Sequence, residues 1–366
     1  MSMVAPKASN HYAALDALRG VAALSVLLFH FDEWLGQKWL APNARFAVDF
    51  FFCLSGYVLS AAYDKKINDG WAKSSFLLTR LIRLFPIIIL GTMISALYYF
   101  IRVYKFGYSL DYDVQLHALV LGLTNLPFLN APKAIGGPQV FPLNGPQYTL
   151  FLELAVNLFW VATHRVSSLY FIAVLIAASF GLMCLFGIGG DTTETFWLGL
   201  PRVVGAFYLG VLSFRLESRT YGIDERYAWG LFVAISAATA LFFYWPSTMP
   251  DISGVIWGFI VSPIIVVCGS RVSLSQRSKR VGIILGQLSY PIYALQFPIF
   301  LWINGVYQQI TGYRDPITLM IVLVFVVPTI SWLVLRFYDE PVRKYLNKIN
   351  HRHRTRGSVA GGNLTR

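Results

Sequence analysis

Residues 13–35 read AALDALRGVAALSVLLFHFDEWL, an almost unbroken apolar stretch that contains Arg19 and His30. A helix needs about 20 mainly apolar residues to cross a bilayer. The stretch is longer than the apolar part of a cleaved signal peptide, which is about 7–15 residues, and it carries charged residues. We therefore expect it to form an uncleaved first membrane-spanning helix.

The composition of the whole chain also indicates a membrane protein. Of its 366 residues, 56% are hydrophobic and 13% are charged, whereas roughly 25% of the residues of a soluble domain are charged. The mean hydropathy is +0.57. No polar block is long enough to form a soluble domain. We expect one membrane domain over residues 1–345 and a basic, disordered cytoplasmic tail over residues 346–366.

Ten apolar segments are long enough to span a bilayer. They are 13–35, 45–63, 84–101, 146–163, 168–187, 196–214, 228–245, 253–270, 282–304 and 316–338. Basic residues of membrane proteins collect in cytoplasmic loops. With ten spans and a cytoplasmic N-terminus, most lysines and arginines fall on the inside. We therefore predict an all-α integral membrane fold of about ten transmembrane helices with both termini cytoplasmic.

An eleventh apolar piece, 116–129, is short and ends near Pro127 and Asn130. If it spanned, every later loop would change sides, and the basic residues at 277–280 would lie outside, against the positive-inside rule. We expect 116–129 to be a re-entrant or interfacial helix, which must be buried by protein or line a hydrated cavity.

The net charge of +12 follows from these cytoplasmic loops, and no basic-aromatic module of a nucleic-acid-binding protein is visible. We expect no nucleic-acid partner. The three cysteines, Cys53, Cys184 and Cys268, lie in apolar runs. Their spacing fits neither a disulfide framework nor a metal site. We expect them to be packing residues and expect no metal.

Arg19 and His30 lie eleven residues apart in the first span. A helix returns to within about 20° of the same direction after eleven residues, so both side chains share one face, about 16 Å apart along the axis. A mid-membrane charge costs roughly 2.5–3.5 kcal/mol on insertion scales and usually faces a cavity or the bundle interior. Either side chain could instead extend to nearby headgroups, but two polar residues on one face favour a lined cavity.

Three further ionisable residues are expected in the outer half of the membrane, at a depth similar to that of His30. Asp49 begins the second span, Glu153 lies about 10 Å into the fourth, and Arg202 is early in the sixth. Ionisable residues inside spans mark functional sites. These side chains could surround one site, although depth does not give their lateral arrangement. Asp49 could equally be a carboxylate at the membrane surface.

Arg80 and Arg83 lie three residues apart in the expected cytoplasmic loop before the third span, so they are neighbours if that loop is helical. The planar guanidinium donates two hydrogen bonds at once, which suits phosphate recognition. The other interpretation is a plain positive-inside anchor.

Taken together, several motifs resemble those of the membrane-bound acyltransferase-3 family, over about residues 12–345. They are LDALRG at 15–20 with His30, VDFF at 48–51 with Ser55-Gly56-Tyr57, Arg80-x-x-Arg83-x-x-Pro86, Glu153 in Tyr148-Thr-Leu-x-x-Glu153, Ser289-Tyr290-Pro-x-Tyr293, and Glu340-Pro341-x-Arg343. Members of the family O-acylate bacterial polysaccharides, lipopolysaccharide and some small molecules. They often have histidine at the position of Gln296, so the resemblance assigns Gln296 no catalytic role.

The resemblance implies a multi-pass O-acyltransferase of the bacterial inner (cytoplasmic) membrane. It would move an acyl group, expected to be acetyl, from cytoplasmic acyl-CoA to a hydroxyl of a cell-surface or exported polysaccharide or glycan. Arg19, Arg80 and Arg83 would bind the phosphates of the donor, acetyl-CoA.

The resemblance also implies roles for the outer residues. His30 would act as general base on the acceptor hydroxyl, or would form a covalent acyl-histidine. Glu153 and Asp49 would orient the imidazole or the acceptor. Arg202 would stabilise the oxyanion as a fixed positive charge.

The alternative hypothesis is a multi-span transporter of a glycan or lipid-linked precursor, because proton-coupled carriers also place arginine, histidine and glutamate inside the membrane. No inverted repeat of the kind many transporters contain is apparent. Binding of CoA separates the two, since CoA should stabilise an acyl-CoA-dependent enzyme by mass action.

Single cysteines introduced at Gly190 and Ser278 in a cysteine-free background test the orientation. An impermeant maleimide added to intact cells should label position 190 and not 278, because the ten-span topology places these loops on opposite sides. The reverse pattern would rule out this topology.

Overall fold

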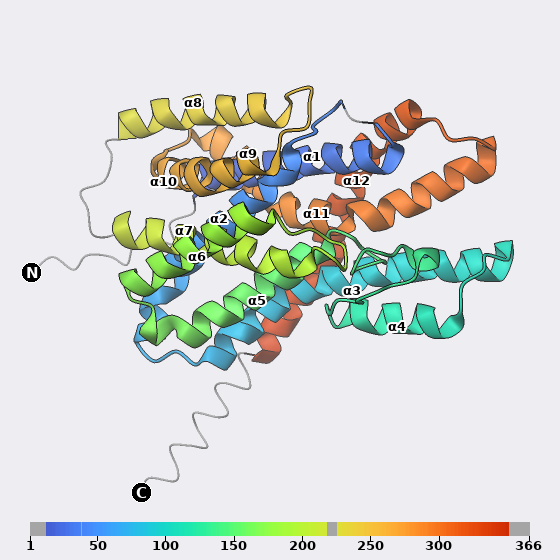
Figure 1. The fold of residues 1–366 in the computed structure, drawn as a ribbon, viewed down its shortest axis with the longest axis horizontal. Coiled ribbons are helices and arrows are strands. Elements are labelled where there is room, and N and C mark those ends of the chain that lie inside the picture. The colour runs from blue at the N-terminus through green and yellow to red at the C-terminus, as the bar shows by residue number, and fades with distance from the viewer. Residues whose placement is uncertain (1–11, 38, 218–224, 351–366) are drawn as a thin grey trace, which may run out of the picture.

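The computed structural model describes residues 12–37, 39–217 and 225–350, which form helices and short connecting segments (Figure 1). The helices are α1 (Ala13–Leu35), α2 (Ala47–Asn68), α3 (Lys73–Phe106), α4 (Tyr112–Leu123), α5 (Gln147–Thr163), α6 (Leu169–Phe186), α7 (Gly199–Glu217), α8 (Glu225–Phe243), α9 (Asp251–Ile256), α10 (Ser262–Arg271), α11 (Gln276–Thr311) and α12 (Pro316–Val334). These ranges contain no strand, only an isolated bridge between Gln139 and Thr192.

Nine helical segments in the described ranges are long and apolar enough to cross a membrane, which confirms the all-α, multi-pass membrane fold. One of them runs from Asp251 to Arg271, because a π-helical turn at Trp257–Val261 joins α9 to α10. The tenth expected span corresponds to α5, which is not one of these nine segments and whose 17 residues lie at the lower limit of about 17 for a bilayer.

The apolar piece 116–129 forms no spanning helix. Its helix, α4, has 12 residues and ends at Leu123, and the chain then turns at Asn125, which has a positive φ. The other end of the chain also differs from the expected boundary. Helix continues beyond α12 to Asn350, past the expected start of the tail at 346. The remainder of the predicted tail, 351–366, lies outside the described residues.

The expected start of the third span at residue 84 was wrong. Helix α3 begins at Lys73 and runs unbroken through Pro86 for 34 residues, so Arg80 and Arg83 lie within a helix and not in a loop. The prediction failed because Pro86 resembles a helix start. The carbonyl of Leu84 near this proline instead accepts a hydrogen bond from Tyr290 Oη at 2.5 Å.

Helix α11 also exceeds its expected length. It has 36 residues and passes through Pro291 and Pro298. A proline at 298 leaves the carbonyl of Ala294 without its helical partner, because proline has no N–H. The buried Asn144 side chain donates to that carbonyl at 2.9 Å. Neighbouring side chains that satisfy freed carbonyls make prolines tolerable inside a span.

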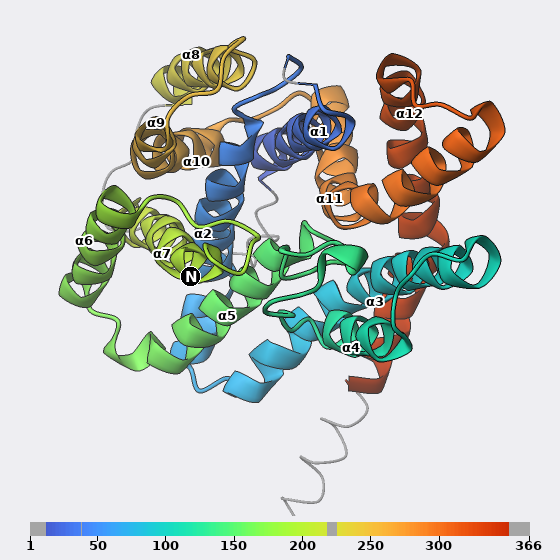
Figure 2. The ribbon, with the colours of Figure 1, turned by 45° about the vertical axis from the view of Figure 1, so that its right-hand side comes forward.

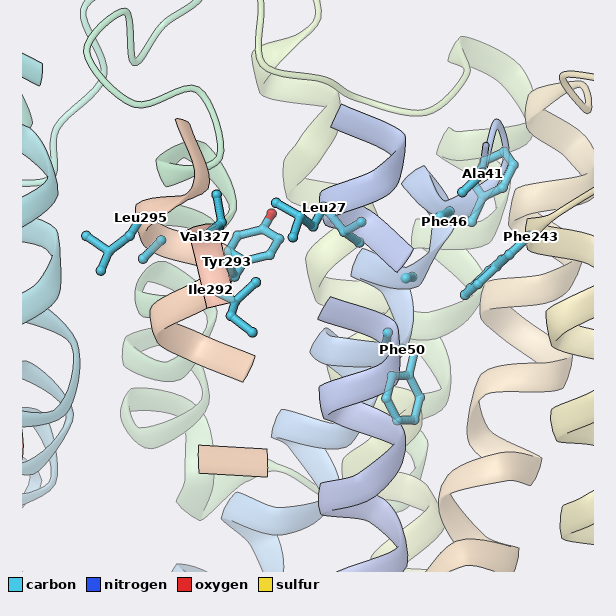
Figure 3. Close-up of a cluster of buried hydrophobic side chains, with 14 of the residues drawn as sticks. Leu27, Ala41, Phe46, Phe50, Phe243, Ile292, Tyr293, Leu295 and Val327 are labelled. Carbon is cyan, nitrogen blue, oxygen red and sulfur yellow. The ribbon is translucent and has the colours of Figure 1, made fainter. Parts of the chain in front are cut away.

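Helices α1 and α11 lie side by side (Figure 2), whereas most side chains of α6 and α8 are exposed on the periphery of the molecule. Leu27 of α1, Phe50 of α2 and Tyr293 of α11 belong to the largest buried apolar cluster (Figure 3). This cluster packs α1, α2 and α11 against one another.

Helices α2 and α7 cross with their backbones almost in contact. A Cβ atom on Gly56 would overlap the carbonyl oxygen of Phe207, and one on Gly210 would overlap that of Cys53. Small residues permit this approach, which gives transmembrane helices their van der Waals contact. Gly56 therefore serves helix packing.

We expect Gly56→Ala to destabilise the protein by about 1–3 kcal/mol, the usual cost of overpacking, measured as a lower midpoint of thermal unfolding in detergent. Gly230→Ala in α8 is the matched control, because no atom lies within 4 Å of its added Cβ. The control should unfold no earlier than the parent. Equal midpoints for both variants would contradict the close crossing.

Candidate functional site

A cavity of about 120 Å³ lies between α1, α2, α3, α5 and α11. Arg19, Arg80 and Arg83, which come from two helices, all line it, together with Glu153 and Tyr293. The structure thus brings together the three arginines that the sequence suggested as phosphate ligands. Its other walls are mainly apolar, so a charged ligand would meet these guanidinium groups in a partly desolvated space.

Arg19 is held by α11. Its Nε donates to Ser289 Oγ at 2.9 Å and its Nη2 to the carbonyl of Gly286 at 2.6 Å. Asp16, one turn earlier on α1, lies 3.4 Å from the same guanidinium. Arg19 therefore faces the bundle interior, as the shared helix face with His30 predicts, and does not extend to the headgroups.

Arg80 and Arg83 differ in their partners. Arg80 is buried and its Nη2 lies 2.5 Å from Glu153 Oε1, which also accepts a hydrogen bond from Ser55 Oγ at 3.1 Å. Arg83 is exposed, and within the described ranges its side chain has no hydrogen bond or ion pair shorter than 4 Å. Arg83 is thus the guanidinium of this cavity that keeps its donors available for a ligand.

The last helical segment closes the same end of the bundle. The buried carboxylate of Asp339 pairs with Arg343 at 2.7 Å and interacts electrostatically with Arg83. Tyr338 Oη donates to the carbonyl of Pro86 at 3.3 Å. The motif around Glu340-Pro341 therefore packs against the arginine-bearing part of α3.

Asp49 and Arg202 form a buried two-pronged ion pair. Nε and Nη2 of Arg202 donate to the two carboxylate oxygens of Asp49 at 2.8 and 2.9 Å. The remaining Arg202 contacts go to the carbonyls of Gly189 and Arg45, at 3.3 and 3.1 Å. Asp49 is thus paired with Arg202 on α7 and is not bonded to His30.

His30 lies at the other end of the α1 face from Arg19. Its ring stacks on Trp34, with centroids 5.0 Å apart and planes 3° apart. Gln296 of α11 lies near the imidazole, but no hydrogen bond of full geometry joins the two side chains. One turn before Gln296, the Tyr293 hydroxyl pairs with Thr149 Oγ1 at 2.7 Å, and both of these residues line the arginine cavity.

The four residues suggested for catalysis are therefore divided among three groups. Asp49 contacts Arg202, Glu153 contacts Arg80, and His30 contacts Trp34. Among residues 12–37, 39–217 and 225–350, no hydrogen bond or ion pair joins His30 to any of the other three.

Two acidic residues near this region were not predicted from the sequence as site residues. Glu33 of α1 and Asp191, in the segment between α6 and α7, interact electrostatically with each other, and both act on Tyr148. Burial raises the pKa of the Asp191 carboxyl above its ordinary value, and a hydrogen bond from its own backbone partly offsets this. The only sequence signal was their position, at the end of the histidine-bearing span and in the Gly-Gly-Asp segment.

The fold and the site define a multi-pass helical membrane protein with an arginine-lined cavity and, further along the same face of α1, a half-buried histidine. Comparison with protein families gives a match over residues 12–336 to the Acyl_transf_3 model, described as an acyltransferase domain. The chain belongs to the acyltransferase-3 family and is a membrane O-acyltransferase. This result decides against the transporter alternative. No solved structure matches the chain.

Curated relatives match parts of the chain. Protein 2 in the picA locus of Rhizobium radiobacter is 36% identical over 156 residues, 40% of this chain and 80% of that protein. The chloroplastic K(+) efflux antiporter 3 of Arabidopsis thaliana is 31% identical over 176 residues, 44% of this chain and 20% of that protein. A Staphylococcus aureus (strain COL) protein, named provisionally as an O-acetyltransferase, is 34% identical over 90 residues, 24% of this chain and 14% of that protein.

Asp49→Ala should destabilise the protein strongly, by about 3–5 kcal/mol, because it leaves the Arg202 charge buried without its partner. The double variant Asp49→Leu with Arg202→Met should lose less stability than Asp49→Ala, since it removes both charges. Thermal unfolding in detergent measures both. A single variant as stable as the parent would contradict the buried pair.

Proposed function

We propose that this O-acyltransferase takes an acetyl group from cytoplasmic acetyl-CoA and transfers it to a hydroxyl of a cell-surface or exported polysaccharide or glycan. It would act in the bacterial inner membrane, with both termini cytoplasmic. The observation that carries the proposal is the arginine cavity on the same α1 face as His30. One end suits a phosphorylated donor, and the other holds a group suited to proton transfer.

The contacts of the cavity arginines support the assignment of this cavity to the phosphorylated acyl donor. Arg19 and Arg80 are each oriented by carboxylates and by neighbouring helices, so their guanidinium planes are held before a ligand arrives. Arg83 keeps its donors unpaired. Phosphate binding by such a preorganised cluster avoids the entropy cost of ordering long side chains.

The transfer step follows ordinary acyl-transfer chemistry. The hydroxyl oxygen of the acceptor attacks the thioester carbonyl carbon while His30 takes the hydroxyl proton. The carbon–sulfur bond then breaks, and the imidazolium returns the proton to the leaving thiolate, which gives free CoA and the acyl ester. A covalent acyl-histidine is the variant of the same step.

The contacts of the remaining candidates favour supporting roles. Glu153 holds Arg80 at 2.5 Å, so we assign it to the donor end, where it fixes the Arg80 guanidinium. Asp49 and Arg202 are buried and paired with each other, and Arg202 also donates to backbone carbonyls, so we assign them to holding α2 against α7. Their pairing leaves Arg202 few donors for an oxyanion.

Membranes supplied with radiolabelled acetyl-CoA and polysaccharide from the host surface test the proposal. His30→Ala should lower transfer of label by about 10²–10⁴-fold, the usual contribution of a general base, while CoA still raises the unfolding midpoint. Arg83→Ala should raise the KM for acetyl-CoA and weaken that CoA-dependent stabilisation, because it removes a phosphate ligand.

Arg277→Ala provides the matched control, since Arg277 is an exposed arginine outside the cavity. It should change neither transfer nor stabilisation by CoA. Parental transfer by His30→Ala would refute the catalytic role of His30. An unchanged KM in Arg83→Ala would refute the donor site.

A further inference from the structure

Gln296 is a fully buried amide in the middle of α11. Its side chain has 0% exposure, and its Nε2 donates to the carbonyl of Tyr293 at 3.0 Å. A carbonyl oxygen accepts but does not donate, so this contact assigns the two ends of the amide: the NH₂ group faces Tyr293 and the oxygen points away from it. That oxygen, Oε1, is buried and has no hydrogen-bond partner in the described part of the chain.

His30 also has a buried polar atom without a hydrogen-bond partner within the described ranges. Its Nδ1 is also buried, and the described residues provide it with no partner that meets full hydrogen-bond geometry. Gln296 is the side chain near this imidazole that could satisfy it, although the two side chains are not yet joined by a hydrogen bond of full geometry. An unsatisfied buried polar atom is destabilising, so an N–H on Nδ1 directed at Oε1 would satisfy two such atoms at once.

Helices α1 and α11 contact each other on both sides of His30 and Gln296. On the N-terminal side of His30, Arg19 donates to Ser289 and Gly286 of α11. On its C-terminal side, Trp34 packs on Phe297 and Phe300 of α11, with ring centroids 5.1 and 4.8 Å apart. Since Trp34 also stacks on His30, the position of α11 and the plane of the imidazole are coupled.

We infer that Gln296 is the positioning residue of His30: its Oε1 accepts the Nδ1–H of the imidazole and thereby keeps Nε2 as the free, proton-accepting nitrogen. The inference rests on the proposed function of His30 as a base. In neutral histidine one nitrogen carries the proton, and the hydrogen bond made by that nitrogen decides which one it is. The Gln296 amide is neutral, so it orients the imidazole without adding a charge next to it. The imidazole therefore stays uncharged until it takes the proton of the acceptor hydroxyl.

Gln296→Leu and Gln296→Glu test this role in the acetyl-CoA transfer assay. Gln296→Leu removes the acceptor atom and should lower kcat about 10- to 100-fold, as does loss of a partner that orients a working histidine, with the KM for acetyl-CoA unchanged. Gln296→Glu keeps an acceptor oxygen and should retain more activity than the leucine variant. Its carboxylate favours the imidazolium, so the acid limb of its kcat–pH profile should move to higher pH.

Gln308→Leu is the matched control, because Gln308 is an exposed glutamine of the same helix that bonds only within it, to Asn304. It should leave kcat and the pH profile unchanged. Stabilisation by CoA, measured for each variant, shows that the donor end remains folded.

Parental kcat in Gln296→Leu, or an unshifted acid limb in Gln296→Glu, would overturn the positioning role. His30→Ala separates this outcome from failure of the proposed function. If His30→Ala is inactive while Gln296→Leu is unaffected, only the role of Gln296 is wrong. If His30→Ala is fully active, the proposed function of His30 itself is wrong.

Discussion

The hydrogen bonds from Arg19 to α11 are the central constraint on how the site is arranged. An arginine within a span must find acceptors in the protein, because the hydrocarbon region offers no water. Arg19 finds them on Ser289 and Gly286. These bonds bring the first helix against the eleventh across the whole length of the chain. They also fix the register of α1 against α11. In this register His30, further along α1, lies near Gln296, further along α11.

Because charged side chains within a span need partners in the protein, most of these charges are paired with one another and few are left to bind a ligand. Asp49 pairs with Arg202, whose other donors are taken by backbone carbonyls, and Arg80 pairs with Glu153. Such buried pairs cost desolvation energy and are not by themselves a source of stability. Arg83 differs from these pairs because it is exposed and has no ion-pair partner within the described ranges, and the Nδ1 atom of His30 is buried without a hydrogen-bond partner there. These incompletely satisfied groups lie at the two ends of one helix-lined region, as a donor-binding end and a proton-transfer end require.

Local sequence rules predicted the helices well and some boundaries poorly. Pro86 and Pro298 look like interruptions when the chain is considered alone, since each removes a backbone donor. In the fold, Asn144 supplies the missing donor to Ala294, and α3 and α11 continue as helices of 34 and 36 residues. The compensating side chains come from distant positions, which no local pattern can reveal. Arg80 and Arg83 were consequently expected in a loop, although they occupy a helix.

Three features follow from the amino-acid sequence alone: the chain is a helical membrane protein, Arg19 and His30 share a helix face, and the motifs belong to an acyltransferase family. These features depend on composition, on local motifs and on the helical repeat, which are properties of short segments. Which charges meet, in contrast, depends on how the helices pack. Depth along the membrane normal suggested one group of His30, Asp49, Glu153 and Arg202, but the lateral packing of α2, α3, α5 and α7 pairs Asp49 with Arg202 and Glu153 with Arg80. Lateral neighbours are chosen by side-chain packing and charge complementarity between helices, and neither is encoded in the periodicity of any single helix.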